Sequence, residues 1–197
     1  LADIPRQVDG IDQVEVLIID DGSTDNTSQV ARQHGADHIV RFAQNRGLGH
    51  AFKAGFDTAL KLGADMIINT DGDNQYFGGD VATLVQPILE QRADLVIGDR
   101  RTGGIGHFSF FKRILQTYGS RVISRLGGLD IPDVASGFRA YTRETALRIS
   151  MFTDFDHTAE HVVQAGQDRW AVVVVPIRTN PKARESRLFS NIGEFVL

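Results

Sequence analysis

Short apolar runs alternate with longer amphipathic segments through the first hundred residues. The apolar runs predict buried strands, and the segments with apolar side chains at helical spacing predict helices. We expect strands at residues 14–19, 38–42, 64–70 and 93–98, and helices at 24–34, 47–62 and 81–91, the last kinked or shortened by Pro87. This order predicts an α/β fold, in which helices flank a mostly parallel sheet with right-handed crossovers.

The alternation is less regular after residue 100. We expect a glycine-rich loop at 102–107, an amphipathic helix at 108–126, a short strand at 135–141, a helix at 155–167 and a strand at 170–177. Trp170 opens the last strand and is expected in the core. His107 is expected on the surface of its loop, and His157 and His161 on a solvated helix face.

Composition and charge narrow the possible classes of protein. The 197 residues fit a single domain, and the absence of cysteine excludes disulfides, thiolate metal sites and cysteine nucleophiles. No stretch approaches the roughly 20 apolar residues that span a bilayer.

Residues 1–99 carry 7 basic and 16 acidic side chains, whereas residues 100–148 carry 9 basic and 3 acidic ones. This asymmetry suggests a cation site followed by a phosphate site; scattered solvated charge is the alternative.

Ligands of open α/β sheets bind at the carboxyl ends of the strands, so ligand-binding residues are expected at the strand exits. The exit at residues 20–25 (DDGSTD) places two carboxylates before a turn. Gly22 permits close backbone approach, and the next helix points its N-terminus there. The exit predicts a nucleotide pocket in which Asp20 and Asp21 accept hydrogen bonds from the base or ribose. A turn that caps the helix is the alternative.

The exit at residues 71–75 (DGDNQ) predicts a divalent cation site. Carboxylates two residues apart and a side-chain amide two further on supply oxygen ligands that suit Mg²⁺ or Mn²⁺ and leave positions for a diphosphate. A calcium loop of the EF-hand kind is rejected, because it requires glycine where Tyr76 stands and glutamate where Ala82 stands. An ordinary Asp/Gly/Asn turn remains the alternative.

A third segment, residues 130–141 (DIPDVASGFRAY), places an arginine among small and apolar residues. An unpaired guanidinium would be costly there. Arg139 is therefore expected either to clamp a phosphate or to form a buried ion pair with Asp133.

Four motifs occur in a characteristic order, at residues 20–25 (DDGSTD), 45–51 (NRGLGHA), 71–75 (DGDNQ) and 136–141 (SGFRAY). In these motifs the chain resembles the family 2 glycosyltransferases, which have the GT-A fold. It is most similar to their dolichol-phosphate mannosyltransferase-like branch, which makes polyprenyl-phosphate sugars. The resemblance extends from about residue 14 to residue 188.

The resemblance implies a role for each matching residue. The expected nucleotide-binding residues are Asp20, Asp21, Ser23, Gly47 and Asp71. The expected metal ligands are Asp71, Asp73 and Gln75, and the expected catalytic residues are Asp73, Arg100, Asp133 and Arg139. The two arginines would contact the acceptor phosphate, and a tail element, Arg184, Ser186 and Arg187, would close over the donor. Gly72 stands where the family more often has alanine.

The chain departs from the family pattern at its start. Family members open with a strand that carries a Pro-x-x-Asn-Glu element and lines the nucleotide pocket, whereas this chain begins Leu1-Ala2-Asp3-Ile4-Pro5. We therefore expect one catalytic domain, residues 1–197, that lacks this strand and any C-terminal membrane segment. The resemblance implies a cytoplasmic location at the face of a membrane.

The expected reaction moves a sugar from a UDP- or GDP-linked donor to a polyprenyl or dolichyl phosphate, with inversion at the anomeric carbon. A phosphate acceptor is anionic at neutral pH and needs little or no general base, whereas a hydroxyl acceptor would need a carboxylate such as Asp133. Two alternatives stay open: a glycosyltransferase acting on a sugar hydroxyl, and a nucleotide-sugar binding module without turnover. The sequence has no P-loop, only a partial dinucleotide glycine pattern, and no sign of nucleic-acid binding.

Overall fold

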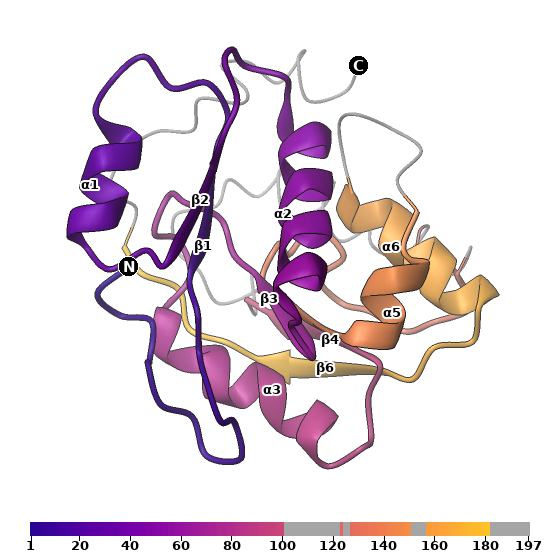
Figure 1. Cartoon of the computed structure of the whole chain (residues 1–197). Coiled ribbons are helices and arrows are strands. Elements are labelled where there is room, and N and C mark those ends of the chain that lie inside the picture. Colours follow the sequence, from indigo (N-terminus) through magenta and orange to yellow (C-terminus); the bar gives the residue numbers. More distant parts are fainter. Residues whose placement is uncertain (101–122, 124–126, 151–156, 182–197) are drawn as a thin grey trace.

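The computed structural model describes residues 1–100, 123, 127–150 and 157–181 (Figure 1). Along the first hundred residues it contains β1 (Leu17–Asp20), α1 (Thr27–Gln33), β2 (His38–Arg41), α2 (Leu48–Leu62), β3 (Met66–Asn69), η1 (Gly78–Asp80), α3 (Val81–Leu89) and β4 (Leu95–Asp99). The predicted elements are all present, although most begin one to three residues later than expected. Helix α3 ends just past Pro87, as the missing amide of proline led us to expect.

The second half adds β5 (Arg139–Thr142), α5 (Arg143–Arg148), α6 (His157–Gln167) and β6 (Val172–Pro176). Helix α5 was not predicted. It begins at the Thr142 cap, whose side chain accepts a hydrogen bond from the Thr145 amide. The predicted loop at 102–107, with His107, and nearly all of the helix at 108–126 lie outside the described residues.

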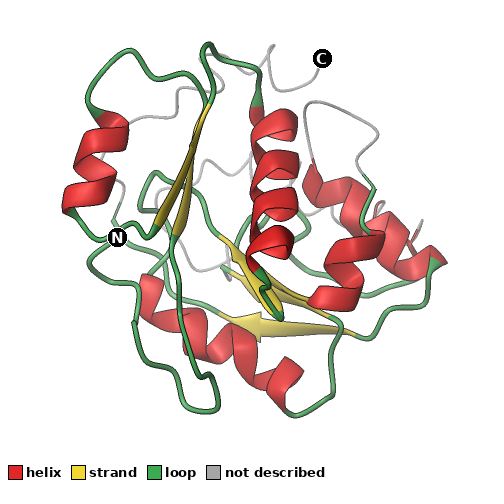
Figure 2. Ribbon diagram, viewed as in Figure 1, coloured by secondary structure: helices red, strands yellow, loops and turns green. Residues whose placement is uncertain are grey.

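The described strands form two sheets flanked by helices, which confirms the predicted α/β class (Figure 2). Strands β1 and β2 pair in parallel, and the second sheet has the order β3-β5-β4-β6. Strand β5 runs antiparallel between β3 and β4, while β4 and β6 are parallel. The residues before β5 thus emerge between the exits of β3 and β4, where ligand-binding groups were expected.

The four-stranded sheet is buried on both faces. One face packs against α2, α5 and α6 through a cluster that includes Phe52, Phe56, Leu95, Ile97, Tyr141 and Val162. The other face packs against α3 through Leu84, Val85, Val96, Phe138 and Ala140. Each fully buried apolar side chain stabilises the fold by roughly 1.5–3 kcal/mol. Trp170 is 7% exposed and belongs to the first cluster, as predicted.

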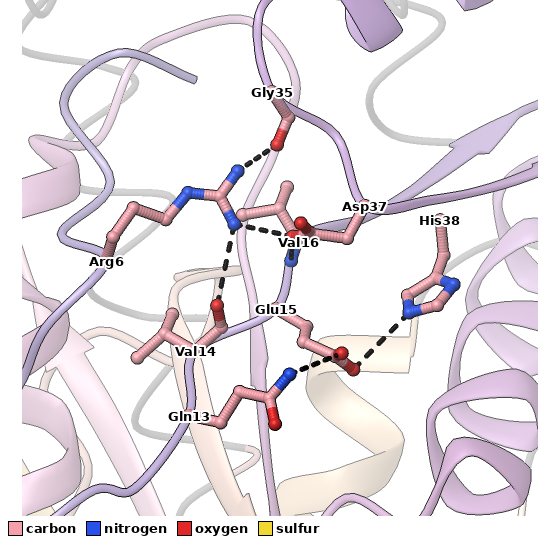
Figure 3. Close-up of polar contacts among 8 residues, drawn as sticks. All are labelled: Arg6, Gln13, Val14, Glu15, Val16, Gly35, Asp37 and His38. Atoms are coloured by element: carbon pink, nitrogen blue, oxygen red, sulfur yellow. Dashed lines mark hydrogen bonds and ion pairs between the residues drawn. The ribbon is translucent and has the colours of Figure 1, made fainter.

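The N-terminal segment is fastened to the entry side of β1 and β2 (Figure 3). The Arg6 guanidinium donates hydrogen bonds to the Gly35 carbonyl and the Asp37 carboxylate. The Val16 amide donates to the same carboxylate at 2.6 Å. These bonds, led by the one from Val16, lower the pKa of Asp37. They lie at the opposite end of β1 from Asp20.

The prediction of a solvated histidine face on α6 was wrong. His157 and His161 are 3% and 0% exposed, and both rings pack on Phe52 of α2. His161 Nδ1 also lies 3.1 Å from the Tyr141 hydroxyl. The spacing of the two histidines identified a common helix face, but their direction was set by the aromatic side chains of other elements.

We expect His161 to make stability depend on pH. Burial, followed by the nearby Arg139 and His157, lowers its pKa well below the usual 6.5. Below pH 6.5 the unfolded chain binds a proton at this residue that the folded chain does not, so stability is lost as pH falls, by up to about 1.4 kcal/mol per pH unit. Urea unfolding between pH 7 and pH 5 should show a flatter pH dependence for His161→Gln than for the unaltered chain.

His34→Gln is the matched control, because His34 is exposed at the C-terminal cap of α1. Its pH dependence should match that of the unaltered chain. Equal slopes for all three proteins would contradict the assignment to His161.

Candidate functional site

Asp20 organises the turn after β1 instead of facing solvent. Its side chain is 2% exposed, and its carboxylate accepts hydrogen bonds from the Ser23 amide at 2.8 Å and from the Ser28 hydroxyl. Burial alone would raise the pKa of Asp20, but these hydrogen bonds, with the Arg41 guanidinium 3.6 Å away, lower it overall. In this arrangement Asp20 does not present the free acceptor for a nucleoside that the sequence suggested.

Asp21 connects the exit of β1 to the start of α2. Its two carboxylate oxygens accept hydrogen bonds from the amides of Arg46, at 2.7 Å, and Gly47, at 3.0 Å. Gly22 has a φ of 73°, and a Cβ there would lie 2.3 Å from the Gln44 backbone. Glycine is therefore required where these two loops touch.

The remaining predicted nucleotide residues of this region lie in the same pair of loops. Ser23 is partly exposed; its carbonyl accepts a hydrogen bond from Arg41 at 2.8 Å. Gly47 caps α2 with a φ of 92°, and nothing lies within 4 Å of a Cβ placed there. The structure thus brings Asp21, Ser23 and Gly47 together at the exits of β1 and β2.

The exit of β3 carries two carboxylates, those of Asp71 and Asp73, on a tight turn. Asp73 Oδ1 accepts the Gln75 amide at 2.9 Å, and Asn74 between them has a φ of 62°. Asp71 and Asp73 keep exposed surface, and Gln75 is half-buried. Oxygen donors of this kind, on one short loop, fit a hard divalent cation that completes its shell with water and diphosphate oxygens. Among the described residues, no group of three or more His, Asp or Glu side chains could hold a metal ion.

The Asp71 carboxylate lies against the backbone just before β5. A Cβ on Gly137 would lie 3.0 Å from Asp71 Oδ2. Asn69 Nδ2 donates to the Gly137 carbonyl at 2.9 Å, and the Gly137 amide donates to the Tyr76 hydroxyl at 2.9 Å. Burial, and then the Asp73 carboxylate, raise the pKa of Asp71, while Arg100 acts in the opposite direction.

Arg100 and Asp133 form a buried, bidentate ion pair. Arg100 Nε and Nη2 donate to the two Asp133 oxygens, each at 2.7 Å, and the Arg100 amide donates to Asp133 Oδ2 at 3.2 Å. Their side chains are 8% and 2% exposed. Burial opposes the charge of Arg100, but the Asp133 hydrogen bonds raise its pKa. The alternative pairing of Asp133 with Arg139 was therefore wrong.

Arg139 does not face the site as a phosphate clamp would. It is 0% exposed, and its guanidinium donates to three backbone carbonyls, those of Val134 at 2.6 Å, Ser136 at 2.8 Å and Thr158 at 2.9 Å. Its charge still lowers the pKa of Asp71, although less than that of Arg100. In this structure Arg139 fixes the loop that carries Gly137.

Sequence reasoning missed three residues that build the site: Asn69, Tyr76 and Asn180. Tyr76 is buried, which raises its pKa to about 12, and its ring packs on Phe138. An aromatic residue directly after an exposed polar loop is a signal that could have identified it, since such a residue needs a core to enter. The predicted tail residues Arg184, Ser186 and Arg187 lie outside the described residues.

The sequence is similar to those of known proteins. The sequence model of glycosyl transferase family 2 matches residues 2–149. The polyprenol monophosphomannose synthase of Mycolicibacterium smegmatis is 33% identical over 71% of this chain and 55% of its own. The undecaprenyl-phosphate mannosyltransferase of Micrococcus luteus is 30% identical over 74% of this chain and 62% of its own. The chain thus spans little more than half the length of these two relatives.

A solved structure supports the fold. Glucosyl-3-phosphoglycerate synthase from Mycobacterium tuberculosis, in complex with Mn²⁺, UDP-glucose and phosphoglyceric acid, aligns with a TM-score of 0.68. The alignment covers 89% of this chain and 64% of that one, at 21% identity. At this identity the likeness establishes the shared glycosyltransferase (GT-A) fold alone. Separately, no described helix is long and apolar enough to cross a membrane.

We expect Asp133→Asn to destabilise the fold strongly. The substitution leaves the buried Arg100 guanidinium without its counter-charge, which costs about 3–5 kcal/mol. Glu144→Gln is the control, because Glu144 pairs with Arg148 on the exposed surface of α5. Such surface pairs contribute little, so its denaturation midpoint in urea should stay close to that of the unaltered chain. Equal midpoints for both variants would show that the buried pair adds no stability.

Proposed function

The chain belongs to glycosyl transferase family 2, and we propose that it transfers a sugar, with inversion, from a nucleotide-sugar to a polyprenyl or dolichyl phosphate. The two relatives above are named for polyprenol and undecaprenyl-phosphate mannose chemistry. The observation that carries the proposal is the convergence of Asp71 and Asp73 with Arg100 at the exits of β3 and β4. A cation held by these two carboxylates would supply the counter-charge that a leaving diphosphate needs.

We assign the divalent cation, Mg²⁺ or Mn²⁺, to Asp71, Asp73 and Gln75. When bound, such an ion neutralises charge on a leaving nucleoside diphosphate as a Lewis acid. The residues fit this task because the Asp73 carboxylate raises the pKa of Asp71, and a cation between the two would offset their repulsion. Gly137 leaves the space that the Asp71 carboxylate occupies.

The ion pair of Arg100 and Asp133 favours a phosphate acceptor over a hydroxyl acceptor. A hydroxyl acceptor would need a general base, and Asp133 was the candidate. Asp133 is 2% exposed, and both of its oxygens accept hydrogen bonds from Arg100. It is therefore poorly placed to remove a proton from a substrate. A phosphate acceptor is already an anion and needs no such base.

The donor nucleoside is proposed to lie at the exits of β1 and β2. Asp21 holds the Arg46 and Gly47 amides, and Ser23 keeps exposed surface there. Asp20 would act indirectly, through the turn that it fastens. Because the proposed acceptor is a lipid phosphate, the site would work at a membrane surface, on its cytoplasmic face.

Asp73→Asn should reduce sugar transfer at least about 100-fold, because loss of a ligand charge removes several kcal/mol of transition-state stabilisation. Transfer would be followed with UDP- and GDP-linked sugars, polyprenyl phosphate and Mn²⁺. Asp57→Asn is the control, since Asp57 is exposed on α2, and its rate should match that of the unaltered chain. Retained transfer with unchanged metal dependence in Asp73→Asn would refute the metal assignment.

The acceptor class has a separate test. With the donor and Mn²⁺ fixed, polyprenyl phosphate should be glycosylated, whereas the matching polyprenol and simple sugars should not. Product analysis by mass spectrometry would distinguish them. Transfer to a sugar hydroxyl alone would support the other glycosyltransferase class, and binding of the donor without transfer to either acceptor would indicate a binding module.

A further inference from the structure

The segment that follows β6 lies along the loop that follows β3. Tyr76 and Thr179 form an antiparallel bridge. On either side of it, the Asn180 amide donates to the Gln75 carbonyl at 2.8 Å, and the Phe77 amide donates to the Arg178 carbonyl at 3.2 Å. Residues about a hundred positions apart in the sequence are thereby joined as a short strand pair.

The Asn180 side chain extends this pairing into the turn itself. Its Nδ2 group donates to the Asn74 carbonyl at 3.2 Å and to the Tyr76 carbonyl at 3.3 Å, and lies 3.5 Å from Asn74 Oδ1. One amide group therefore contacts the backbone on both sides of Gln75. A side chain with no donor at its end could make none of these bonds.

The turn that Asn180 contacts has an unusual backbone. Asn74 adopts a φ of 62°, in the left-handed region that residues other than glycine rarely occupy. This turn brings the Gln75 amide to Asp73 Oδ1 at 2.9 Å and so fixes the direction of Asp73. The hydrogen bonds from Asn180 favour that conformation over more extended ones.

The segment is itself held firmly. The Arg178 guanidinium and amide donate to the buried Asp80 carboxylate, the amide at 2.6 Å, and the guanidinium lies 4.1 Å from the Phe77 ring centroid. Arg178 thus anchors the segment to η1, and Asn180 is presented to the turn from a fixed position.

We propose that Asn180 is a positioning residue for the cation loop: it holds the left-handed turn at Asn74 and thereby the geometry of Asp73 and Gln75 relative to Asp71. The inference rests on the proposed function, because it takes these residues as the ligands. Asn180 itself touches only the loop, so its effect reaches the cation through the ligands. Partners of metal ligands typically change metal affinity about 10- to 100-fold when they are removed.

The test compares Asn180→Ala with Asn180→Gln, which keeps the amide donor. Free Mn²⁺ would be titrated by electron paramagnetic resonance in the presence of uridine or guanosine diphosphate. Asn180→Ala should weaken Mn²⁺ binding about tenfold, and Asn180→Gln should restore part of the loss. Amide hydrogen exchange without metal should be faster at Gln75 in Asn180→Ala, because the turn opens more often.

Thr179→Ala is the matched control on the same segment, because Thr179 joins the loop through its backbone bridge to Tyr76, which the substitution keeps. It leaves the Asn180 amide group and the Arg178 anchor in place, so Mn²⁺ affinity should stay within about twofold of the unaltered chain. Unchanged Mn²⁺ affinity and unchanged exchange at Gln75 in Asn180→Ala would overturn the proposal. If the unaltered chain binds no Mn²⁺, the proposed function fails instead, and the exchange at Gln75 alone then decides whether Asn180 holds the turn.

Discussion

A line of charged side chains at the exits of β3 and β4 is the constraint on which the rest of the site depends. Asp73 repels Asp71, Arg100 offsets Asp71, and Asp133 in turn offsets Arg100. Removing Asp133 would leave the buried Arg100 guanidinium without its counter-charge, where desolvation is costly. The antiparallel course of β5 makes the line possible, because it brings the loop with Asp133 and Gly137 between the two exits.

The two ends of the proposed site are built in different ways. At the exits of β1 and β2, the carboxylates of Asp20 and Asp21 accept hydrogen bonds from loop amides. The surface proposed to meet a nucleoside therefore consists of backbone, Ser23 and the start of α2. At the exit of β3, Asp73 stays exposed, the Asp71 carboxylate lies against Gly137, and Asn180 donates to the backbone of the loop. This division suits a donor with a neutral base at one end and a strongly charged diphosphate at the other.

The strands, the helices and the loops of the proposed site could largely be predicted from the sequence, because local patterns mark the strand exits. The loops containing Asp21 and Asp73 were identified from an apolar run followed by carboxylates and glycine. The partners of Arg100 and Arg139 could not be predicted. Arg139 is much nearer to Asp133 in the sequence, yet the path of β5 brings Asp133 to Arg100 and leaves Arg139 with backbone carbonyls. The burial of His161 and the role of Asn180 depend likewise on contacts between segments far apart in the sequence.

The close contact between Asp71 and Gly137 also limits which residue types fit at the glycine positions of the motifs. At Gly137 a methyl group would lie 3.0 Å from an Asp71 carboxylate oxygen, so alanine there would require that side chain to shift. At Gly72, between the two acidic residues, a methyl group would meet nothing within 4 Å, and its backbone needs no positive φ. The middle of the acidic motif therefore has room for glycine or alanine, whereas alanine at position 137, 65 positions away in the chain, would displace the Asp71 carboxylate.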